Sequence, residues 1–209
     1  MADRREYSTA YERNRGPILE VLREIEPGGD QILEVGSGSG QHVCDFAKQL
    51  LKPDGSPYRW QPTEQEENLE SIDAWRAHEG VEERVASPIA IDLLDERWDE
   101  ALLRGEYAMV MSINVVHIVA WEGVLNLLAG ASRLLEGGGV LYLYGPYRAH
   151  DREIEPSNEA FDQWLKERFI GGGLRYQEDM VRVASERGLE LVEDVAMPAN
   201  NRSLIFRKS

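Results

Sequence analysis

The sequence has a single cysteine, Cys44, so the chain can form no internal disulfide. So little cysteine is typical of proteins from a reducing compartment. No apolar run approaches the roughly 20 residues that a membrane-spanning helix needs. The opening stretch, MADRREYSTAYERNRG, is charged and lacks the apolar core of a signal peptide. These absences predict a cytoplasmic protein that does not enter a membrane.

Basic residues are also scarce. The chain has 23 Lys and Arg against 38 Asp and Glu, which gives a formal net charge of −15. A field of this sign repels phosphate backbones, so nucleic acid is not an expected partner and a small molecule suits the charge balance better. The four histidines and the cysteine show no metal-ligand spacing, so no metal is expected. The oligomeric state is left open.

What the sequence does contain is an alternation of short apolar runs with longer segments of helical periodicity. Strands are expected at 31–36, 58–64, 84–93, 107–118, 140–147, 189–198 and 202–208. Helices are expected at 11–25, 41–51, 68–80 and 121–139, the last ending in a glycine cap, with two more on either side of a glycine hinge at 171–173. The helix at 11–25 is expected to carry Pro17 near its first turn. This alternation predicts an α/β fold, a mostly parallel sheet with helices on both faces.

Glycine occupies every second position in the stretch ILEVGSGSGQH, as Gly36, Gly38 and Gly40. A dinucleotide-binding turn has its third small residue one position later, where this chain has Gln41, and a P-loop ends in Gly-Lys-Ser/Thr, which is absent. The turn therefore lacks both standard phosphate-binding patterns. A tight turn that serves only close packing is the competing interpretation.

Three acidic residues sit at the ends of the first three predicted strands. Glu34 lies in an otherwise apolar strand, where burial is costly without a cationic or hydrogen-bonding partner. Glu64 ends the second strand, where a carboxylate can accept from both ribose hydroxyls, and Asp92 follows the third. Each acid alone is more often a surface residue or a helix cap. Together they indicate a pocket for a cationic nucleoside without a phosphate.

The glycine turn followed by an acid at the end of the second strand resembles class I S-adenosylmethionine-dependent methyltransferases. More narrowly, the segments ERNRGPIL, LEVGSGSGQH, WQPTE, INVVHI, GGGVLYLYGPY, PSNEAFD and MPANNRSLIFRK resemble the DUF938/UPF0585 (methyltransferase-like protein 26) family. The resemblance implies a Rossmann-like seven-stranded sheet with an antiparallel last strand, and S-adenosylmethionine as cofactor. It implies one domain over residues 1–209, with a helical cap at 1–28 and a helical insertion at 148–180 near the substrate mouth.

The resemblance also implies roles for single residues. Glu34, Gly36, Gly38 and Gly40 would bind the methionine end of the cofactor, Glu64 the ribose and Asp92 the adenine. The loop at 52–57 is longer than in the family pattern. It lies directly before the strand that ends in Glu64 and affects how Glu64 aligns with that pattern. We further expect Asn114 and Asn14 to contact the cofactor. Asn114 follows the fourth strand, and Asn14 lies in the first helix, which would close over the site as a lid or else form a plain charged face.

Candidates for catalysis and acceptor binding follow the fourth and fifth strands. His117 is a candidate general base or donor, or else a histidine that shapes the following helix, and Tyr147 is a second catalytic candidate. Arg148 would suit a carboxylate on the acceptor but is as readily a solvated side chain. The remaining acceptor-binding candidates are Arg13, Tyr144, Asn158, Asn200 and Asn201. Phe161 and Trp164, at helical spacing, are expected to belong to the core, the alternative being a platform for the substrate.

The resulting prediction is methyl transfer from S-adenosylmethionine to a small-molecule acceptor. Three alternatives remain open at this point. The chain could be a cofactor-binding scaffold without turnover, or a protein methyltransferase that recruits a basic partner to its acidic surface. It could also be a nicotinamide-dependent oxidoreductase, against which Gln41 argues. Neither the acceptor nor its reacting atom follows from the sequence.

Overall fold

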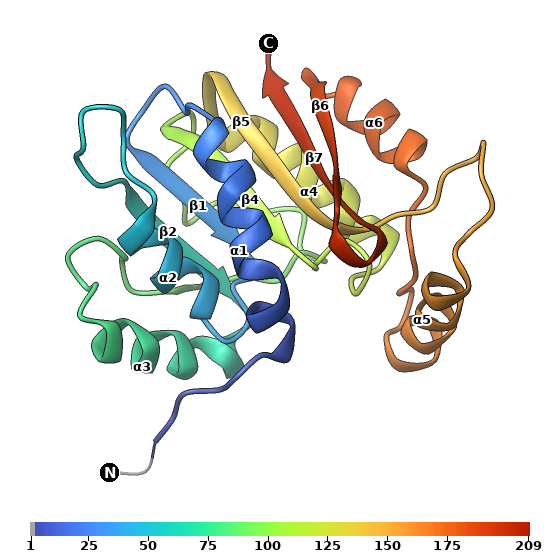
Figure 1. Cartoon of the computed structure of the whole chain (residues 1–209). Coiled ribbons are helices and arrows are strands. Elements are labelled where there is room, and N and C mark those ends of the chain that lie inside the picture. The colour runs from blue at the N-terminus through green and yellow to red at the C-terminus, as the bar shows by residue number, and fades with distance from the viewer. Residues whose placement is uncertain (1–2) are drawn as a thin grey trace.

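A computed structural model describes residues 3–209, which form a seven-stranded sheet flanked by helices (Figure 1). The strands are β1 (Gln31–Val35), β2 (Arg59–Glu64), β3 (Ile89–Ala90), β4 (Tyr107–Ile113), β5 (Leu135–Pro146), β6 (Leu189–Met197) and β7 (Asn201–Lys208). The α-helices are α1 (Thr9–Glu24), α2 (Gln41–Gln49), α3 (Leu69–Glu79), α4 (Trp121–Leu134), α5 (Pro156–Arg168) and α6 (Gln177–Ser185), and short 3-10 turns occupy Glu66–Asn68 and Pro198–Asn200.

The strand order is β3-β2-β1-β4-β5-β7-β6. Strands β1 to β5 pair in parallel, whereas β7 runs antiparallel to both of its neighbours, β5 and β6. The chain order reverses direction across the sheet between β1 and β4, which is the switch point where open sheets of this kind bind ligands. The structure therefore confirms the predicted fold class, including the antiparallel last strand.

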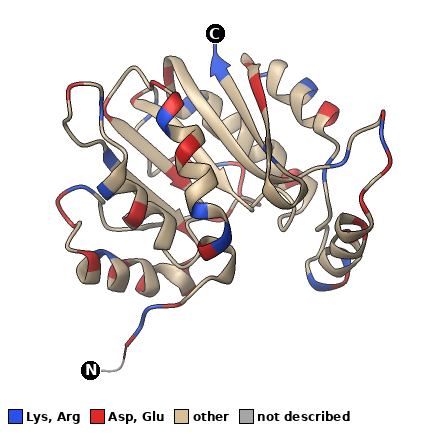
Figure 2. Cartoon of the chain, viewed as in Figure 1, with Lys and Arg blue, Asp and Glu red and all other residues tan. Residues whose placement is uncertain are grey.

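Two apolar cores lie on opposite faces of the sheet. Side chains of β1 alternate between them, with Ile32 in the core under α1, α2 and α3, and Leu33 and Val35 in the core under α4 and α6. Strand β4, YAMVMSI, is buried along its whole length and carries no charge, as expected of a central strand covered on both faces. Charged side chains are instead spread over the helices and loops (Figure 2).

The third predicted strand, 84–93, is mostly not a strand. Only Ile89–Ala90 pairs with β2 as β3, and Val85 makes an isolated bridge to Trp60. Pro88 separates these two contacts and has no backbone N–H for a ladder. The segment therefore follows the edge of the sheet in two short contacts and then turns outward at Asp92.

Two further expectations were wrong in detail. Helix α4 ends at Leu134 without a glycine cap, and Gly137–Gly139 belong to the irregular start of β5, where Leu135 pairs with Tyr107. Pro17 lies in the middle of α1 and not near its first turn. Because proline has no N–H, α1 lacks one internal hydrogen bond there and is held instead by its buried face.

No helix within residues 3–209 combines the length and the apolar character that crossing a bilayer requires. The longest, α1, has 16 residues and a mixed polar and apolar sequence.

Two glycines of α4 offer a matched test of how Trp98 packs against this helix. A methyl group on Gly130 would overlap the indole of Trp98, which is fixed by a 2.9 Å hydrogen bond from Nε1 to the carbonyl of Asn126. A methyl group on Gly123 would meet Val119 and Leu93 at ordinary distances of 3.4 and 3.5 Å. We expect Gly130→Ala to lower the free energy of unfolding by about 1–3 kcal/mol. Gly123→Ala should leave it unchanged or raise it by up to about 1 kcal/mol.

Urea denaturation of the two variants beside the wild-type protein checks this expectation. Equal effects of the two substitutions would contradict the packing of Trp98 against α4.

Candidate functional site

The glycine turn between β1 and α2 is shaped by the end of β2. The carbonyl oxygen of Thr63 accepts hydrogen bonds from the amides of Gly36 at 3.0 Å and Ser37 at 2.9 Å. A Cβ on Gly36, whose φ is +76°, would overlap Val115, and a Cβ on Gly40 would lie 2.8 Å from the Cα of Ile72. Close packing therefore requires the two outer glycines.

The middle glycine has a different environment. A Cβ on Gly38 would meet no atom within 4 Å, and the residue lines a cavity of about 550 Å³. This volume falls within the range of small-molecule sites. The cavity lies at the carboxyl ends of β1, β2, β3 and β4 and is lined by Gly36, Gly38, Glu64, Gln65, Ile91, Asp92, Leu93, Leu94, Ile113, Asn114, Val115, Ile118, Val119, Ala120, Phe169 and Ile170. Gly36 and Gly40 therefore serve close packing, whereas Gly38 leaves space beside the cavity.

Two of the predicted acids face this cavity. Glu64 accepts from the amide of Gly38 at 2.6 Å through Oε2 and from the amide of Gln65 at 2.8 Å through Oε1. Asp92 accepts from the amide of Leu94 at 2.9 Å through Oδ1. These backbone bonds orient the carboxylates, and each oxygen keeps a lone pair for a further donor. The two acids can therefore accept from hydroxyl or amine groups of a ligand.

Asn114 lies on the wall of the cavity where β4 ends. Its backbone has a positive φ of 60°, which is uncommon for a residue with a side chain. The backbone N–H of Asn114 donates to the carbonyl of Tyr144 at 2.8 Å, and this contact joins the end of β4 to β5. Such strained conformations gather at functional sites, where the surrounding structure imposes them.

Glu34 lies below the cavity and not on its wall. Its side chain is 1% exposed, and no described side chain or backbone group hydrogen-bonds to its Oε2 atom. Burial raises the pKa of Glu34 to about 8, and the nearby charge of Glu64 acts in the same direction. The carboxyl is therefore largely protonated at neutral pH. It faces the α1–α2 side of the sheet near Cys44, whose pKa is raised chiefly by burial and further by Glu34 in its ionised form.

Helix α1 is held over α2 by polar contacts of buried side chains. Asn14 is 6% exposed, and its Oδ1 lies 2.7 Å from Nε2 of His42. Burial lowers the pKa of His42 to about 4, so its ring is neutral and Nε2–H donates to Asn14. The Gln41 side chain accepts from the amide of Ser8 at 2.6 Å. Asn14 and Gln41 thus dock the first helix in this structure, while Arg13 on the same helix is exposed.

A second group of predicted residues surrounds Gly145 on β5. His117 is 3% exposed, and its Nδ1 atom has no hydrogen-bond partner among the described residues. A Cβ on Gly145 would lie 3.2 Å from this nitrogen and 3.7 Å from Oδ1 of Asn114. Burial lowers the pKa of His117 to about 4, and the charge of Arg175 adds to this shift. The imidazole is therefore neutral at physiological pH.

Tyr144 and Tyr147 flank this glycine on β5 and the loop after it. The hydroxyl of Tyr147 is buried without a described partner, and burial raises its pKa far above the usual value, so it stays protonated and acts only as a neutral hydroxyl. Burial likewise raises the pKa of Tyr144, whereas the charge of Arg13 and a contact with Asn201 oppose the shift. Arg13 on α1 and Asn201 on β7 therefore both influence the ionisation of Tyr144 on β5.

The other candidates for acceptor binding lie elsewhere. Arg148 donates from Nη2 to Oδ2 of Asp162 at 2.7 Å, so its charge is already paired. Asn158 is buried in the first turn of α5, and Asn200 is exposed in the turn before β7 with a φ of 57°. The side chain of Asn201 donates to the carbonyl of Pro198 at 2.9 Å.

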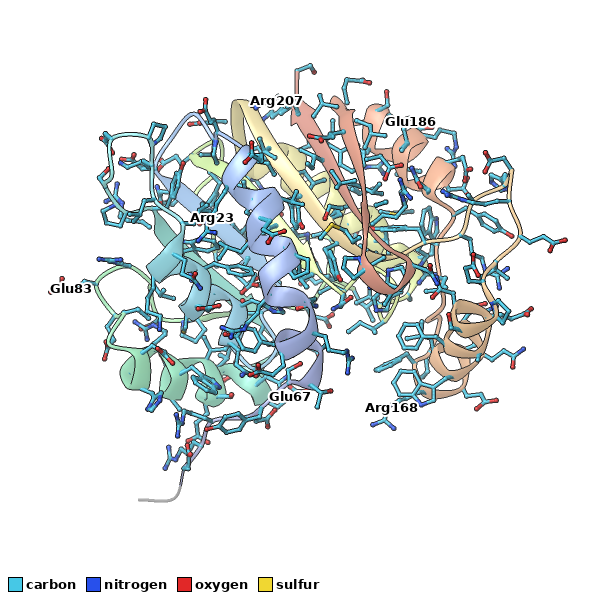
Figure 3. All side chains as sticks on the ribbon, in the orientation of Figure 1. Arg23, Glu67, Glu83, Arg168, Glu186 and Arg207 are labelled. Atoms are coloured by element: carbon cyan, nitrogen blue, oxygen red, sulfur yellow. The ribbon has the colours of Figure 1, made fainter. Side chains whose placement is uncertain are left out.

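Phe169 and Ile170 complete the cavity and are absent from the set of residues proposed from the sequence. They follow α5, which stands apart from the helices that cover the sheet (Figures 1 and 3). The amide of Gly173 donates to the carbonyl of His117 at 2.9 Å and holds this segment over the loop after β4. The glycine run at 171–173 indicates that the chain changes direction after α5. It does not indicate that Phe169 and Ile170 contact the cavity.

A protein family described as "Protein of unknown function (DUF938)" matches residues 5–208 of the chain.

Solved structures with this fold include several methyltransferases. An O-methyltransferase family protein from Burkholderia thailandensis superposes with a TM-score of 0.80 at 17% identity, over 96% of this chain and 57% of that protein. Mitomycin 7-O-methyltransferase MmcR gives 0.79 at 14% identity, over 96% and 55%. PigF with SAH gives 0.74 at 14% identity, over 94% and 56%. The chain thus spans just over half the length of these proteins. At these identities the likeness shows a common fold.

The burial of Glu34 leads to a pH-dependent stability. The folded protein has a raised pKa of about 8 at this carboxyl, while the unfolded chain keeps the ordinary value near 4.5. Between these values the folded state holds a proton that the unfolded state releases. The free energy of unfolding therefore falls as the pH rises through this window. Glu34→Gln removes the titration, so its stability relative to wild type should grow by about 1–4 kcal/mol from about pH 5 to about pH 9.

Urea denaturation at the two pH values measures this difference. Glu83→Gln, which changes an exposed acid, serves as the control and should follow the wild-type pH profile. If Glu34→Gln also follows that profile, Glu34 does not carry a raised pKa.

Proposed function

Because the chain belongs to the DUF938 family and carries a cavity edged by a glycine turn and two acids, we propose that it transfers a methyl group from S-adenosylmethionine to a small-molecule acceptor. The observation that carries this proposal is the placement of Glu64 and Asp92 on one cavity beside a turn without phosphate-binding features. The methyltransferases that share the fold support it. The proposal includes a reducing, cytoplasmic location, which the single cysteine supports.

The residues on the cavity fit an adenosine group. In the proposed complex the ribose hydroxyls donate to Glu64, and the exocyclic amine of adenine donates to Asp92. The apolar side chains Ile91, Leu93 and Phe169 suit the faces of a purine ring. Because Gly38 has no side chain, a ligand can approach the backbone closely at this position. Asn114 lies where the sulfur end of the cofactor would meet the acceptor.

The methionine end would extend from the glycine turn toward α1. Gly36, Gly38 and Gly40 shape that side of the turn, and the carboxyl of Glu34 has an unpartnered oxygen beneath it. A cofactor ammonium is a cationic partner that favours the ionised form of Glu34. Asn14 on α1 closes the same side.

When bound, the cofactor supplies a methyl group on a positively charged sulfur, which is already activated for displacement. The protein then has to align the acceptor with the methyl group and to exclude water. His117, with its neutral ring, is proposed to take a proton from the acceptor where the acceptor holds one. Tyr147 is proposed to orient the acceptor as a neutral hydroxyl, because its pKa is too high for a base. Arg13, Tyr144, Arg148, Asn158, Asn200 and Asn201 stay proposed contacts of the acceptor, although the charge of Arg148 is already paired with Asp162.

Calorimetric titration tests cofactor binding, and the loop after β3 offers a matched pair of variants. Asp92 and Asp95 each accept one backbone amide at 2.9 Å, but only Asp92 lines the cavity. We expect S-adenosylmethionine and S-adenosylhomocysteine to bind the wild-type protein. Asp92→Asn should weaken both by about tenfold or more, because a hydrogen bond to a charged group contributes about 1.5–3 kcal/mol, and Asp95→Asn should not.

Absence of binding by both compounds at high micromolar concentration would contradict the proposal. A parallel fluorescence titration with NADH should show no saturable binding, whereas tight NADH binding would favour an oxidoreductase instead.

Substitutions on the cofactor side and on the acceptor side should affect cofactor affinity to different extents. We expect Glu34→Ala to reduce S-adenosylhomocysteine affinity more than His117→Ala does, since Glu34 lies beneath the cofactor turn and His117 lies on the acceptor side. Calorimetry on both variants measures the difference, and thermal unfolding of the ligand-free proteins controls for misfolding. A larger loss of affinity in His117→Ala would mean that the assigned role of His117 is wrong.

A further inference from the structure

Helix α5 and the turn after it carry a group of aromatic side chains outside the core. The α5 aromatic patch consists of Phe161, Trp164 and Phe169. Trp164 stacks on Phe161 with ring centroids 5.6 Å apart and planes at 14°, and it meets Phe169 edge-on at 5.9 Å. Trp164 is 47% exposed, and the adjoining Ile170 is 99% exposed. The expectation that Phe161 and Trp164 belong to the core is therefore wrong for Trp164.

The patch connects the cavity to the unpaired histidine. Phe169 lines the cavity at one end of the patch. At the other end Phe161 packs edge-on against the ring of His117, with centroids 5.6 Å apart. An exposed aromatic side chain such as Trp164 marks a binding site when it adjoins a cavity. The patch therefore runs from the edge of the cavity, at Phe169, to the ring of His117.

The cations around the patch are already engaged. Arg148 and Lys166 both donate to Oδ2 of Asp162 at 2.7 Å. Arg175 donates to backbone carbonyls, at 3.0 Å to Val116 and at 2.8 Å to Gly171. Arg168 lies over the Trp164 ring at 5.6 Å and marks the outer end of the patch in Figure 3. The α5 aromatic patch is therefore suited to recognising a ligand through apolar and aromatic contact, because the cations beside it are engaged.

The polar group next to Phe161 is the Nδ1 atom of His117. A neutral imidazole has one N–H and one free lone pair, and burying a ring nitrogen without a hydrogen-bond partner is unfavourable. The backbone carbonyl of His117 is fixed by Gly173, and the edge-on contact with Phe161 holds the ring. A ligand hydroxyl that reached Nδ1 would supply the missing donor.

We propose that Phe161 and Trp164 of the α5 aromatic patch form the acceptor site together with His117, and that the acceptor is a planar aromatic ring bearing a hydroxyl group. The ring packs against Trp164 and Phe161, and its hydroxyl donates to Nδ1 of His117. This inference rests on the proposed methyl transfer. In the reaction the hydroxyl oxygen forms a bond to the methyl carbon while the carbon–sulfur bond breaks and leaves its electron pair on sulfur. The hydroxyl proton passes to Nδ1 and from there to water.

Binding of model alcohols tests the acceptor class. 2-Naphthol is planar and aromatic, and decahydro-2-naphthol has the same carbon skeleton and hydroxyl but no aromatic ring. Calorimetry is run on the wild-type protein saturated with S-adenosylhomocysteine. We expect 2-naphthol to bind at least about tenfold more tightly than its saturated counterpart, and Trp164→Ala to remove most of this preference. Leu103→Ala, which truncates another large exposed side chain (52% exposed), should leave it unchanged.

A second comparison tests the hydroxyl contact. 2-Methoxynaphthalene keeps the rings but has no donor, so His117→Phe should erase the wild-type preference for 2-naphthol over it. Affinity for S-adenosylhomocysteine should stay within about twofold of wild type in Trp164→Ala, because Trp164 does not line the cavity.

The outcomes separate the two proposals. If S-adenosylhomocysteine binds but the aromatic and saturated alcohols bind equally, or Trp164→Ala has no effect, the acceptor assignment is wrong and the proposed methyl transfer stands. If S-adenosylhomocysteine does not bind, both proposals fall.

Discussion

The contact between the end of β2 and the glycine turn determines the shape of the site. Thr63 accepts two amides of the turn through its carbonyl, and Glu64 accepts the amide of Gly38 at 2.6 Å. These bonds fix the conformation of the turn. On its other side, Val115 in the loop after β4 packs on Gly36. The same carboxylate that fixes the turn faces the cavity. A change at the end of β2 would therefore alter both the backbone that approaches a ligand and the group that binds it.

Two buried groups, one in β1 below the glycine turn and one beside Gly145, each have a polar atom without a hydrogen-bond partner among residues 3–209. Glu34 and His117 each keep an unpaired atom in the interior, and burial disfavours the charged form of both. Unpaired buried polar atoms are rare in native proteins and call for an explanation such as a ligand or a catalytic role. Glu34 lies on the side of α1 and α2, and His117 on the side of α5. The proposed reaction assigns the cofactor to the first and the acceptor to the second.

Sequence reasoning located this site better than it described its walls. The glycine spacing and the acids at strand ends are local patterns, and the topology of parallel sheets brings strand ends together, so Glu64 and Asp92 could be placed on one crevice. The direction of a long side chain is set by tertiary partners, and Arg148 therefore turned out to pair with Asp162. The position of Phe169 depends on how the chain returns from α5. Helical spacing alone could not separate a core tryptophan from the exposed Trp164.

A crystal structure of the protein with S-adenosylhomocysteine tests the central claim most directly. We expect the ribose hydroxyls within hydrogen-bond distance of Glu64, the adenine amine at Asp92, and the sulfur directed toward Asn114 and His117. The opposite result would be a ligand bound elsewhere on the molecule, or one in the cavity whose ribose lies away from Glu64. Either would contradict the assignment of this cavity as a cofactor site.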